Sequence, residues 1–388
     1  MIKTYKVMLL PNNKQKTKLF QYANTARFAY NLALGKEQEN YKNGGKFISD
    51  GDLRKELTQL KKTSEYAWLN DISNNVTKQA IKDACGAYQD FFKGYTNFPR
   101  FKSRKHGKPK FYQDTAKIKF TSTHVKVEGF ARSKKKNKQK LNWIRLAEKG
   151  RIPMDVKYYN PRIKFDGIHW WITVGIEYED FTALPTRDGI GIDLGIKDLA
   201  VCSDREKPYK NINKTQKIGK LKKKKRRLQR SIGRKYEKNK KGGSYCKTSN
   251  IIKREKELLK LNHRLTDIRH TYLHQTTTEI INRKPRFIVL EDLNVKGMMK
   301  NKHLSKAIAE QCFYEFYRQI EYKCSWNNIS FLTAERFYAS SKLCSCCGII
   351  KKDLKLSDRI YKCKNCNLVM DRDKNASINL YNYGKSIA

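Results

Sequence analysis

The stretch that decides the fold is GIGIDLGIKDLAV, Gly189–Val201, because it places one carboxylate inside an otherwise apolar run. Ile192 and Leu194 flank Asp193, and a short apolar run of this kind predicts a buried strand. A charge taken out of water is costly unless it is paired or binds a metal ion. Asp193 therefore requires a partner that comes from elsewhere in the chain.

Two further acids occur in a similar setting. Glu291 follows the apolar segment Phe287–Leu290, which predicts a second buried strand, and Asp373 opens a predicted helix that continues to about Tyr383. Carboxylates that converge repel one another unless a divalent cation lies between them. The three acids predict a mixed α/β fold in which they bind two Mg²⁺ ions that activate water for phosphodiester hydrolysis. The alternative for each acid is a helix cap or a surface charge.

Neighbouring acids compete for two of these roles. Asp371 lies two residues before Asp373 in DRDKNAS, and either could face the metal ions, although Asp373 is better placed at the helix start. Asp292 follows Glu291 directly and should point to the opposite face if the strand continues. We therefore predict Asp373 and Glu291 as ligands.

Four cysteines show the spacing of a zinc site. In CSCCGIIKKDLKLSDRIYKCKNC, the pair Cys344-x2-Cys347 is separated by 15 residues from the pair Cys363-x2-Cys366, which is typical of a structural zinc ribbon. Four thiolates close the coordination shell, so this zinc would be structural. Cys346 could compete with Cys347 as a ligand. The other cysteines are predicted to be small buried hydrophobic residues: Cys85, Cys202, Cys246, Cys312 and Cys324.

The charge of the chain indicates a polyanionic partner. Its 388 residues include 84 Lys and Arg against 37 Asp and Glu, a formal net charge of +47, which favours nucleic acid. An acidic membrane surface is the competing partner, but we find no uninterrupted apolar run of roughly 18 residues. The N-terminal sequence also lacks the features of a signal peptide. We expect a cytoplasmic, nucleoid-associated prokaryotic protein that does not enter membranes.

The N-terminal half changes character along its length. An alternating strand pattern at residues 3–10 precedes helical patterns through about residue 97, and short alternating segments follow from about 113 to 180. These segments and the first strand predict a compact β-barrel, with a basic hairpin loop at residues 131–140.

Between these two parts, FPRFKSRKHGKPKF interleaves aromatic and basic residues from residue 98 to 111. This pattern suits nucleic-acid backbone contact with base stacking, and Arg100, Lys102 and Arg104 are the candidate contacts. A solvated basic loop is the alternative. A second basic stretch, residues 217–243, carries Leu221, Leu228 and Ile232 at helical spacing, so one face could pack while the other meets phosphate.

Taken together, the motifs resemble those of TnpB proteins, the nucleases encoded by insertion sequences, which are similar to the ancestors of type V CRISPR effectors. The motifs are RFAYN, FPRFKSRK, GIDLGIKDLAV, IVLEDLNVKGM, SSKLCSCCG and CKNCNLVMDRDKNASINL, in this order along nearly the whole chain. The resemblance implies an RNA-guided double-stranded DNA endonuclease with Asp193, Glu291 and Asp373 as its metal-binding triad. It also implies that Asn75 and Gln79 help to read a short DNA motif beside the target.

The resemblance further implies a division into domains. A β-barrel wedge domain (1–11 and 113–183) and an inserted helical recognition domain (12–112) would hold a guide RNA derived from the transposon end. A RuvC-like, RNase H-type nuclease domain (184–343 and 367–388) would carry the triad, with the zinc ribbon (344–366) inserted in it. The alternatives are an RNA-guided repressor that does not cleave, a compact type V CRISPR effector, and a basic RNA-binding structural protein.

Overall fold

The computed structural model describes residues 2–105, 107–131, 139–178, 185–355 and 357–387. The chain forms two compact units, Met1–Glu179 and Asp180–Ala388. The predicted boundary at 183/184 and most of the predicted basic loop at 131–140 lie outside the described residues. No helix in the described ranges is long and apolar enough to cross a membrane.

Unit 1 contains a seven-stranded antiparallel sheet in the order β2-β6-β7-β1-β5-β4-β3. The first strand pairs with β7 and β5, as predicted, and closure of this sheet into a barrel stays a prediction. The strands are β1 (Ile2–Leu10), β2 (Lys110–Tyr112), β3 (Lys119–Phe120), β4 (His124–Lys126), β5 (Trp143–Leu146), β6 (Tyr158–Phe165) and β7 (Trp170–Glu177).

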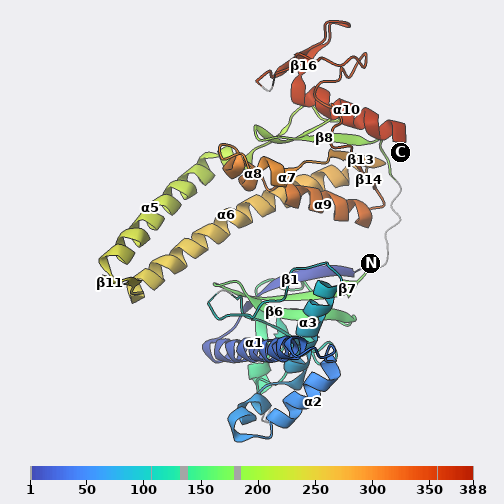
Figure 1. Ribbon diagram of the computed structural model, residues 1–388. Coiled ribbons are helices and arrows are strands. Elements are labelled where there is room, and N and C mark those ends of the chain that lie inside the picture. Colours follow the sequence, from blue (N-terminus) through green and yellow to red (C-terminus); the bar gives the residue numbers. More distant parts are fainter. Residues whose placement is uncertain (1, 106, 132–138, 179–184, 356, 388) are drawn as a thin grey trace. The chain divides into compact units, whose positions relative to one another are not determined.

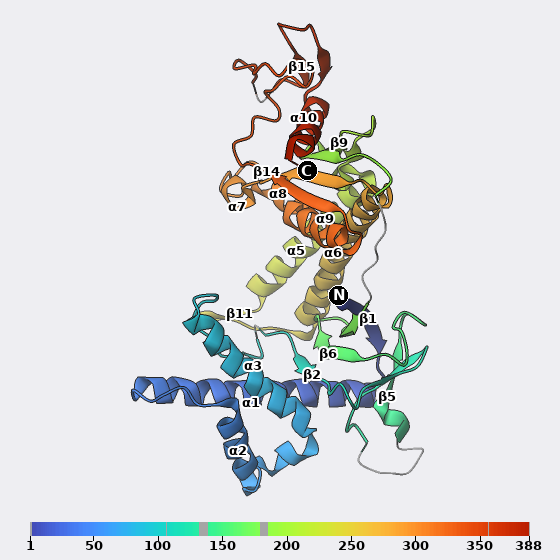
Figure 2. The same ribbon diagram turned by 90° about the vertical axis from the view of Figure 1, so that its right-hand side faces the viewer.

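The helices of unit 1 pack on this sheet. Asn12 begins α1 by accepting a hydrogen bond from the backbone N–H of Gln15, and α3 crosses α1 in both views (Figures 1 and 2). One hydrophobic core runs from the helices into the sheet, so the predicted division into wedge and recognition domains stays a prediction. The helical segments are α1 (Asn13–Lys42), α2 (Asp50–Leu60), η1 (Ser64–Asp71), α3 (Asn74–Phe92) and η2 (Lys140–Asn142).

Unit 2 is built on a five-stranded sheet in the order β10-β9-β8-β13-β14. The central pairs β8–β13 and β13–β14 are parallel, whereas β8–β9 is antiparallel, so the mixed α/β fold is confirmed. Its strands are β8 (Ile190–Leu194), β9 (Asp198–Cys202), β10 (Tyr209–Lys210), β13 (Phe287–Glu291) and β14 (Ser330–Ala334).

Helices cover both faces of this sheet (Figure 1). Because side chains alternate along a strand, Ile288 and Leu290 of β13 pack with α6 and α9, whereas Phe287 and Val289 pack with α10 on the other face. The helices of unit 2 are η3 (Ile212–Lys214), α5 (Gln216–Lys238), α6 (Ser249–Asn282), α7 (Val295–Met298), α8 (Ser305–Gln311), α9 (Phe313–Trp326) and α10 (Arg372–Ile387).

Helix α10 lies directly on the backbone of β8. A Cβ atom on Gly191 would come within 2.2 Å of the carbonyl oxygen of Ser377 and 2.3 Å of the backbone nitrogen of Tyr381. Only glycine allows this approach. The glycine two residues before Asp193 therefore brings the strand of Asp193 against the helix of Asp373.

The basic stretch after the first acid forms a helical hairpin of α5 and α6. Leu228 and Ile232 of α5 are buried, as predicted, and most of its lysines and arginines are exposed. Leu221 is only half-buried, and Ile218 takes the third buried position. Two short strands, β11 (Lys240–Lys241) and β12 (Ser244–Tyr245), connect the helices.

The prediction for the cysteines outside the zinc motif is partly wrong. Cys85, Cys202 and Cys324 are buried, but Cys312 is half-buried and Cys246 is exposed. Cys246 follows the β11–β12 hairpin, which has no core beneath it to bury a side chain, and both of its strands are exposed.

Candidate metal centres

The fold brings the three predicted acids to one edge of the sheet in unit 2. Asp193 lies near the end of β8, and Glu291 ends β13, where the parallel register aligns Leu290 with Ile192. Asp373 occupies the first turn of α10, which packs on β8. All three side chains are half-buried. The charges of Glu291 and Asp373 both act on Asp193, so residues up to 180 positions apart lie near one another.

The electrostatics of this carboxylate cluster (Asp193, Glu291 and Asp373) favour a cation. Burial first, and then the charges of Glu291 and Asp373, raise the pKa of Asp193 well above its usual range. Burial also raises the pKa of Glu291, against which a hydrogen bond from the Ser340 hydroxyl acts. A divalent cation would supply the positive charge that these carboxylates need in order to ionise together.

One side chain already supplies positive charge at the cluster. The guanidinium of Arg372 lies 3.2 Å (Nη2) and 3.3 Å (Nε) from Oδ1 of Asp373, and its charge lowers the pKa of Asp193. This single guanidinium does not offset the three acids, because the pKa of Asp193 remains raised.

The competing acids are engaged elsewhere. Asp371 is exposed, and its Oδ1 accepts hydrogen bonds from the backbone N–H groups of Asp373 (2.9 Å) and Lys374 (3.2 Å), which makes it a helix cap. Asp292 forms an ion pair with Arg336 at 2.6 Å. The charge of Asp371 also raises the pKa of Asp193, so the choice of Asp373 and Glu291 as ligands stays a prediction.

The four predicted zinc ligands form a much tighter group. Their Sγ atoms all lie within 4.8 Å of one another, with Cys344 and Cys366 3.5 Å apart and Cys347 and Cys363 3.6 Å apart. Within the described residues, no other group of three or more ligand side chains is this close. Cys346 is exposed and lies outside the cluster, so the first knuckle contributes Cys344 and Cys347.

The chemistry of this cysteine cluster suits zinc. A hydrogen bond from the backbone N–H of Ile349 lowers the pKa of Cys347 to about 6, and the backbone N–H of Cys366 lowers that of Cys363. Burial raises the pKa of Cys344. Against a hydrogen bond from the Leu368 backbone, burial and the three neighbouring thiols raise the pKa of Cys366, so two of the four thiols ionise readily before a metal binds. Zinc binds the thiolate form, which the hydrogen bonds to Cys347 and Cys363 favour. The short strands β15 (Ile360–Lys362) and β16 (Val369–Asp371) flank the second knuckle, and the buried Tyr361 packs against the cysteines.

A short segment, residues 340–345, connects the two clusters. The Ser340 hydroxyl binds Glu291, and the Ser340 carbonyl accepts a hydrogen bond from the Asn379 side chain at 2.7 Å. Asn375 donates to the carbonyl of Leu343 (2.6 Å) and accepts from the backbone N–H of Ser345 (3.0 Å), on either side of Cys344.

Neither this segment nor the two asparagines of α10 that bind it are among the predicted site residues. Asn375 and Asn379 lie four residues apart on the face of α10 that also buries Ala376 and Leu380. Buried polar side chains need hydrogen-bond partners. Their helical spacing among apolar residues was the available signal.

The nucleic-acid candidates on α3 form hydrogen bonds within unit 1. The amide of Asn75 donates to the carboxylate of Glu128 at 3.3 Å, and that of Gln79 donates to Asp83 at 2.9 Å. Asp83 in turn forms an ion pair with Arg162 of β6. Both amides are therefore held in place by neighbouring acids.

The basic aromatic segment contributes to a cavity of about 590 Å³ in unit 1. Lys102 and Arg104 line it, while Arg100 is exposed elsewhere. The ammonium of Lys102 lies 2.9 Å from the centre of the Tyr30 ring, and burial lowers its pKa to about 7. Further cationic side chains line the same cavity: Arg27, Lys108, Lys110, Arg162 and Lys164.

Three family models match the chain. A model described as "Probable transposase" covers residues 174–302, a Cas12f1-like TNB domain covers 313–380, and a helix-turn-helix domain covers 1–46. The TNB match contains the cysteine cluster. In this structure, residues 1–46 contain strand β1 and helix α1.

Two curated relatives match over nearly the full length of the chain, and a third matches a shorter part. A protein of Escherichia coli K12 named "Putative RNA-guided DNA endonuclease InsQ" is 28% identical over 404 residues, covering 100% of this chain and 93% of that relative. A "Putative RNA-guided DNA endonuclease" of Streptomyces pristinaespiralis is 28% identical over 378 residues, covering 97% and 88%. A "TnpB-like protein" of Methanocaldococcus jannaschii is 32% identical over 124 residues, covering 30% and 43%.

Solved structures share the fold. The protein chain in the cryo-EM structure of a Cas12f1–sgRNA–target DNA complex aligns with a TM-score of 0.63 at 13% identity, covering 98% of each chain. CasPhi-2 (Cas12j) bound to crRNA aligns with a TM-score of 0.51 at 9% identity, again covering 98% of each. At these identities the similarity concerns the fold alone.

Proposed function

Because the chain belongs to the TnpB family, we propose that it is an RNA-guided double-stranded DNA endonuclease of an insertion sequence. The observation that carries the proposal is the convergence of Asp193, Glu291 and Asp373 at one sheet edge, with a raised pKa at Asp193. A structural protein gains nothing from a buried acid whose pKa is raised further by two neighbouring carboxylates. Nucleic-acid partners fit the net charge of +47.

In this proposal the three carboxylates hold two Mg²⁺ ions in a RuvC-like site. Bound there, the ions would activate water and stabilise the leaving oxygen of the phosphodiester. The chain's own residues orient the ligands: Ser340 holds the Glu291 carboxylate, and the cap at Asp371 fixes the first turn that carries Asp373. The described residues offer one such site, so both DNA strands would be cut there in turn.

Sequence recognition would be divided between RNA and protein. Pairing between a guide RNA from the transposon end and the target strand would supply most of it, as in RNA-guided nucleases generally. Asn75 and Gln79 would read a short duplex motif beside the target. Arg100 and the cavity side chains Lys102 and Arg104 would contact the nucleic-acid backbone.

The cysteine cluster would hold a structural zinc ion that stabilises the ribbon at residues 344–366. With chromosomal DNA as its substrate, we expect the protein to act in the cytoplasm in association with the nucleoid.

The experiment is to express the chain with its native flanking DNA, sequence the RNA that copurifies, and offer a plasmid library with the matching target beside randomised bases. We expect cleavage that requires both the guide and Mg²⁺, selects one flanking motif, and disappears in Asp193→Ala. Bound RNA and target binding without cleavage would replace this function with guided repression. Absence of any defined RNA would overturn guidance itself.

A further inference from the structure

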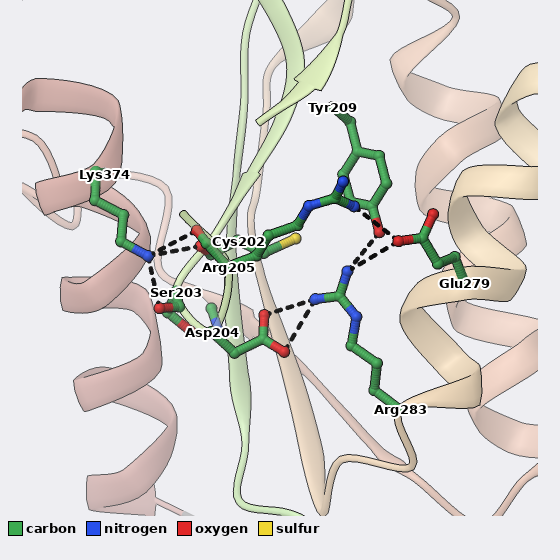
Figure 3. A network of polar contacts seen from close by, with 9 residues as sticks. Cys202, Ser203, Asp204, Arg205, Tyr209, Glu279, Arg283 and Lys374 are labelled. Carbon is green, nitrogen blue, oxygen red and sulfur yellow. Dashed lines mark hydrogen bonds and ion pairs between the residues drawn. The ribbon is translucent and has the colours of Figure 1, made fainter. Parts of the chain in front are cut away.

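Lys374 follows Asp373 in the first turn of α10, and its side chain binds the backbone at the end of β9 and just beyond it. Its ammonium donates to three backbone carbonyls, those of Cys202 (3.1 Å), Ser203 (2.7 Å) and Arg205 (2.9 Å). Figure 3 shows these three contacts converging on one nitrogen. An ammonium has three N–H donors, so this turn of the backbone satisfies Lys374 completely.

The segment that Lys374 binds, residues 202–206 between β9 and β10, is also bound to the strand of Asp193. The backbone N–H of Ser203 donates to the carbonyl of Gly191 at 2.9 Å, and the Ser203 hydroxyl accepts from the Gly191 N–H at 3.0 Å. Gly191 is two residues before Asp193. A short chain of hydrogen bonds therefore runs from the strand of one carboxylate to the helix of another.

The same segment is fixed from its other side, by the end of α6 (Figure 3). Arg283 binds both carboxylate oxygens of Asp204, at 2.8 and 2.9 Å, and donates to the Tyr209 hydroxyl at 2.6 Å. Arg205 forms an ion pair with Glu279 at 2.7 Å. These contacts attach the segment to α6. Its position therefore does not depend on Lys374 and α10 alone.

Energetics agree with a positioning task. Lys374 is half-buried, and its three hydrogen bonds to backbone carbonyls offset the cost of taking the ammonium partly out of water. Apolar contacts of α10 with the sheet already attach the helix through Leu380 and its neighbours. These apolar contacts lie further along the helix, whereas the hydrogen bonds of Lys374 attach the first turn, which carries Asp373.

We propose that Lys374 is a positioning residue that sets the distance between Asp373 and Asp193, and thereby the affinity of the carboxylate cluster for divalent cations. The proposal rests on the proposed function for its link to DNA cleavage, but not for its effect on metal binding. Residues that orient metal ligands without touching the metal typically change affinity by about 10- to 100-fold.

The test compares Lys374→Met, which keeps the stem and removes the donors, with Lys374→Arg, which restores donors and charge. Lys385→Met is the matched control, because Lys385 is an exposed lysine in the last turn of the same helix. Two quantities are measured on the full chain with its RNA: Mn²⁺ affinity by electron paramagnetic resonance, and the Mg²⁺ concentration that gives half-maximal cleavage.

We expect Lys374→Met to weaken both by about tenfold with target binding unchanged, Lys374→Arg to recover part of the loss, and Lys385→Met to match the wild type. A loss of activity that only follows the folded fraction, with unchanged metal affinity, would overturn the proposal. If the wild-type complex cleaves no DNA, the proposed function fails, and the Mn²⁺ affinities still decide the role of Lys374.

Discussion

The cysteine cluster and the carboxylate cluster lie in the same unit but differ in how closely their ligand atoms are gathered. The cysteines come from 23 consecutive residues, and their Sγ atoms lie within 4.8 Å of one another before any metal is considered. The carboxylates come from three elements spread over 181 residues, and their oxygens are not gathered so closely. A structural site gains stability by closing completely, whereas a catalytic site must leave room for substrate and water.

The largest expected effect on cleavage comes from the two acids of DRDKNAS, Asp371 and Asp373. Asp373→Asn should lower cleavage by more than about a hundredfold, because even groups that only orient metal ligands change metal affinity by 10- to 100-fold. Single-turnover cleavage with guide RNA at several Mg²⁺ concentrations measures this. Asp371→Asn is the control, since asparagine also caps helices well. The assignment is wrong if Asp371→Asn shows the larger loss.

Substitution of a cysteine ligand should affect local stability strongly and cleavage less than Asp373→Asn does. Cys363→Ser should lose the zinc and unfold the ribbon, because metal binding supplies about 10–16 kcal/mol to small zinc domains. Cys346→Ser should retain one zinc per chain, since this thiol is exposed outside the cluster. Atomic absorption and proteolysis of residues 344–366 report the outcome. Zinc loss in the Cys346 variant would contradict the ligand set.

The segment that connects the two clusters predicts a moderate loss of cleavage, smaller than the loss expected for Asp373→Asn. Ser340→Ala removes the hydroxyl that binds Glu291 while leaving the backbone carbonyl that Asn379 contacts. We expect cleavage to fall by about tenfold with zinc content unchanged. Zinc analysis and cleavage rates measured on the same sample separate the two effects. Wild-type rates would show that the hydroxyl does not orient Glu291 in the active complex.

The smallest expected effect concerns pH. The pKa of Asp193 and that of Glu291 are both raised, so each group stabilises the folded state below its unfolded pKa and loses that contribution as pH rises through the folded value. Metal-free protein should therefore lose thermal stability in unit 2 as the pH rises through the raised pKa values, and Mg²⁺ should reduce the loss. Thermal unfolding with EDTA and with Mg²⁺ across this range measures both. The thermal stability of a metal-free Asp193→Asn variant should depend less on pH than that of the wild type.

Local patterns in the sequence indicated the candidate ligands, whereas the residues that contact them could not be recognised because those contacts are long-range. The knuckle spacing of the cysteines and the acids on apolar runs can be read within a few residues, so Cys344, Asp193 and Glu291 stood out in the sequence. Ser340 and Lys374 were not recognisable, because their partners lie 49 and about 170 residues away. The prediction that Cys246 is a core residue is wrong, because burial depends on whether other elements pack against the hairpin and not on residue type alone.

The contact between Gly191 and Ser377 has a consequence for how the protein folds. These residues are 186 positions apart in sequence, yet their backbones touch. Closing so long a loop costs entropy before any contact repays it, and topologies rich in such distant contacts fold slowly. We expect the ribbon and the α5–α6 hairpin to form early from neighbouring residues, and the seating of α10 on β8 to come late. Nuclease competence would then arise only at the last step of folding, after the nucleic-acid-binding surfaces are complete.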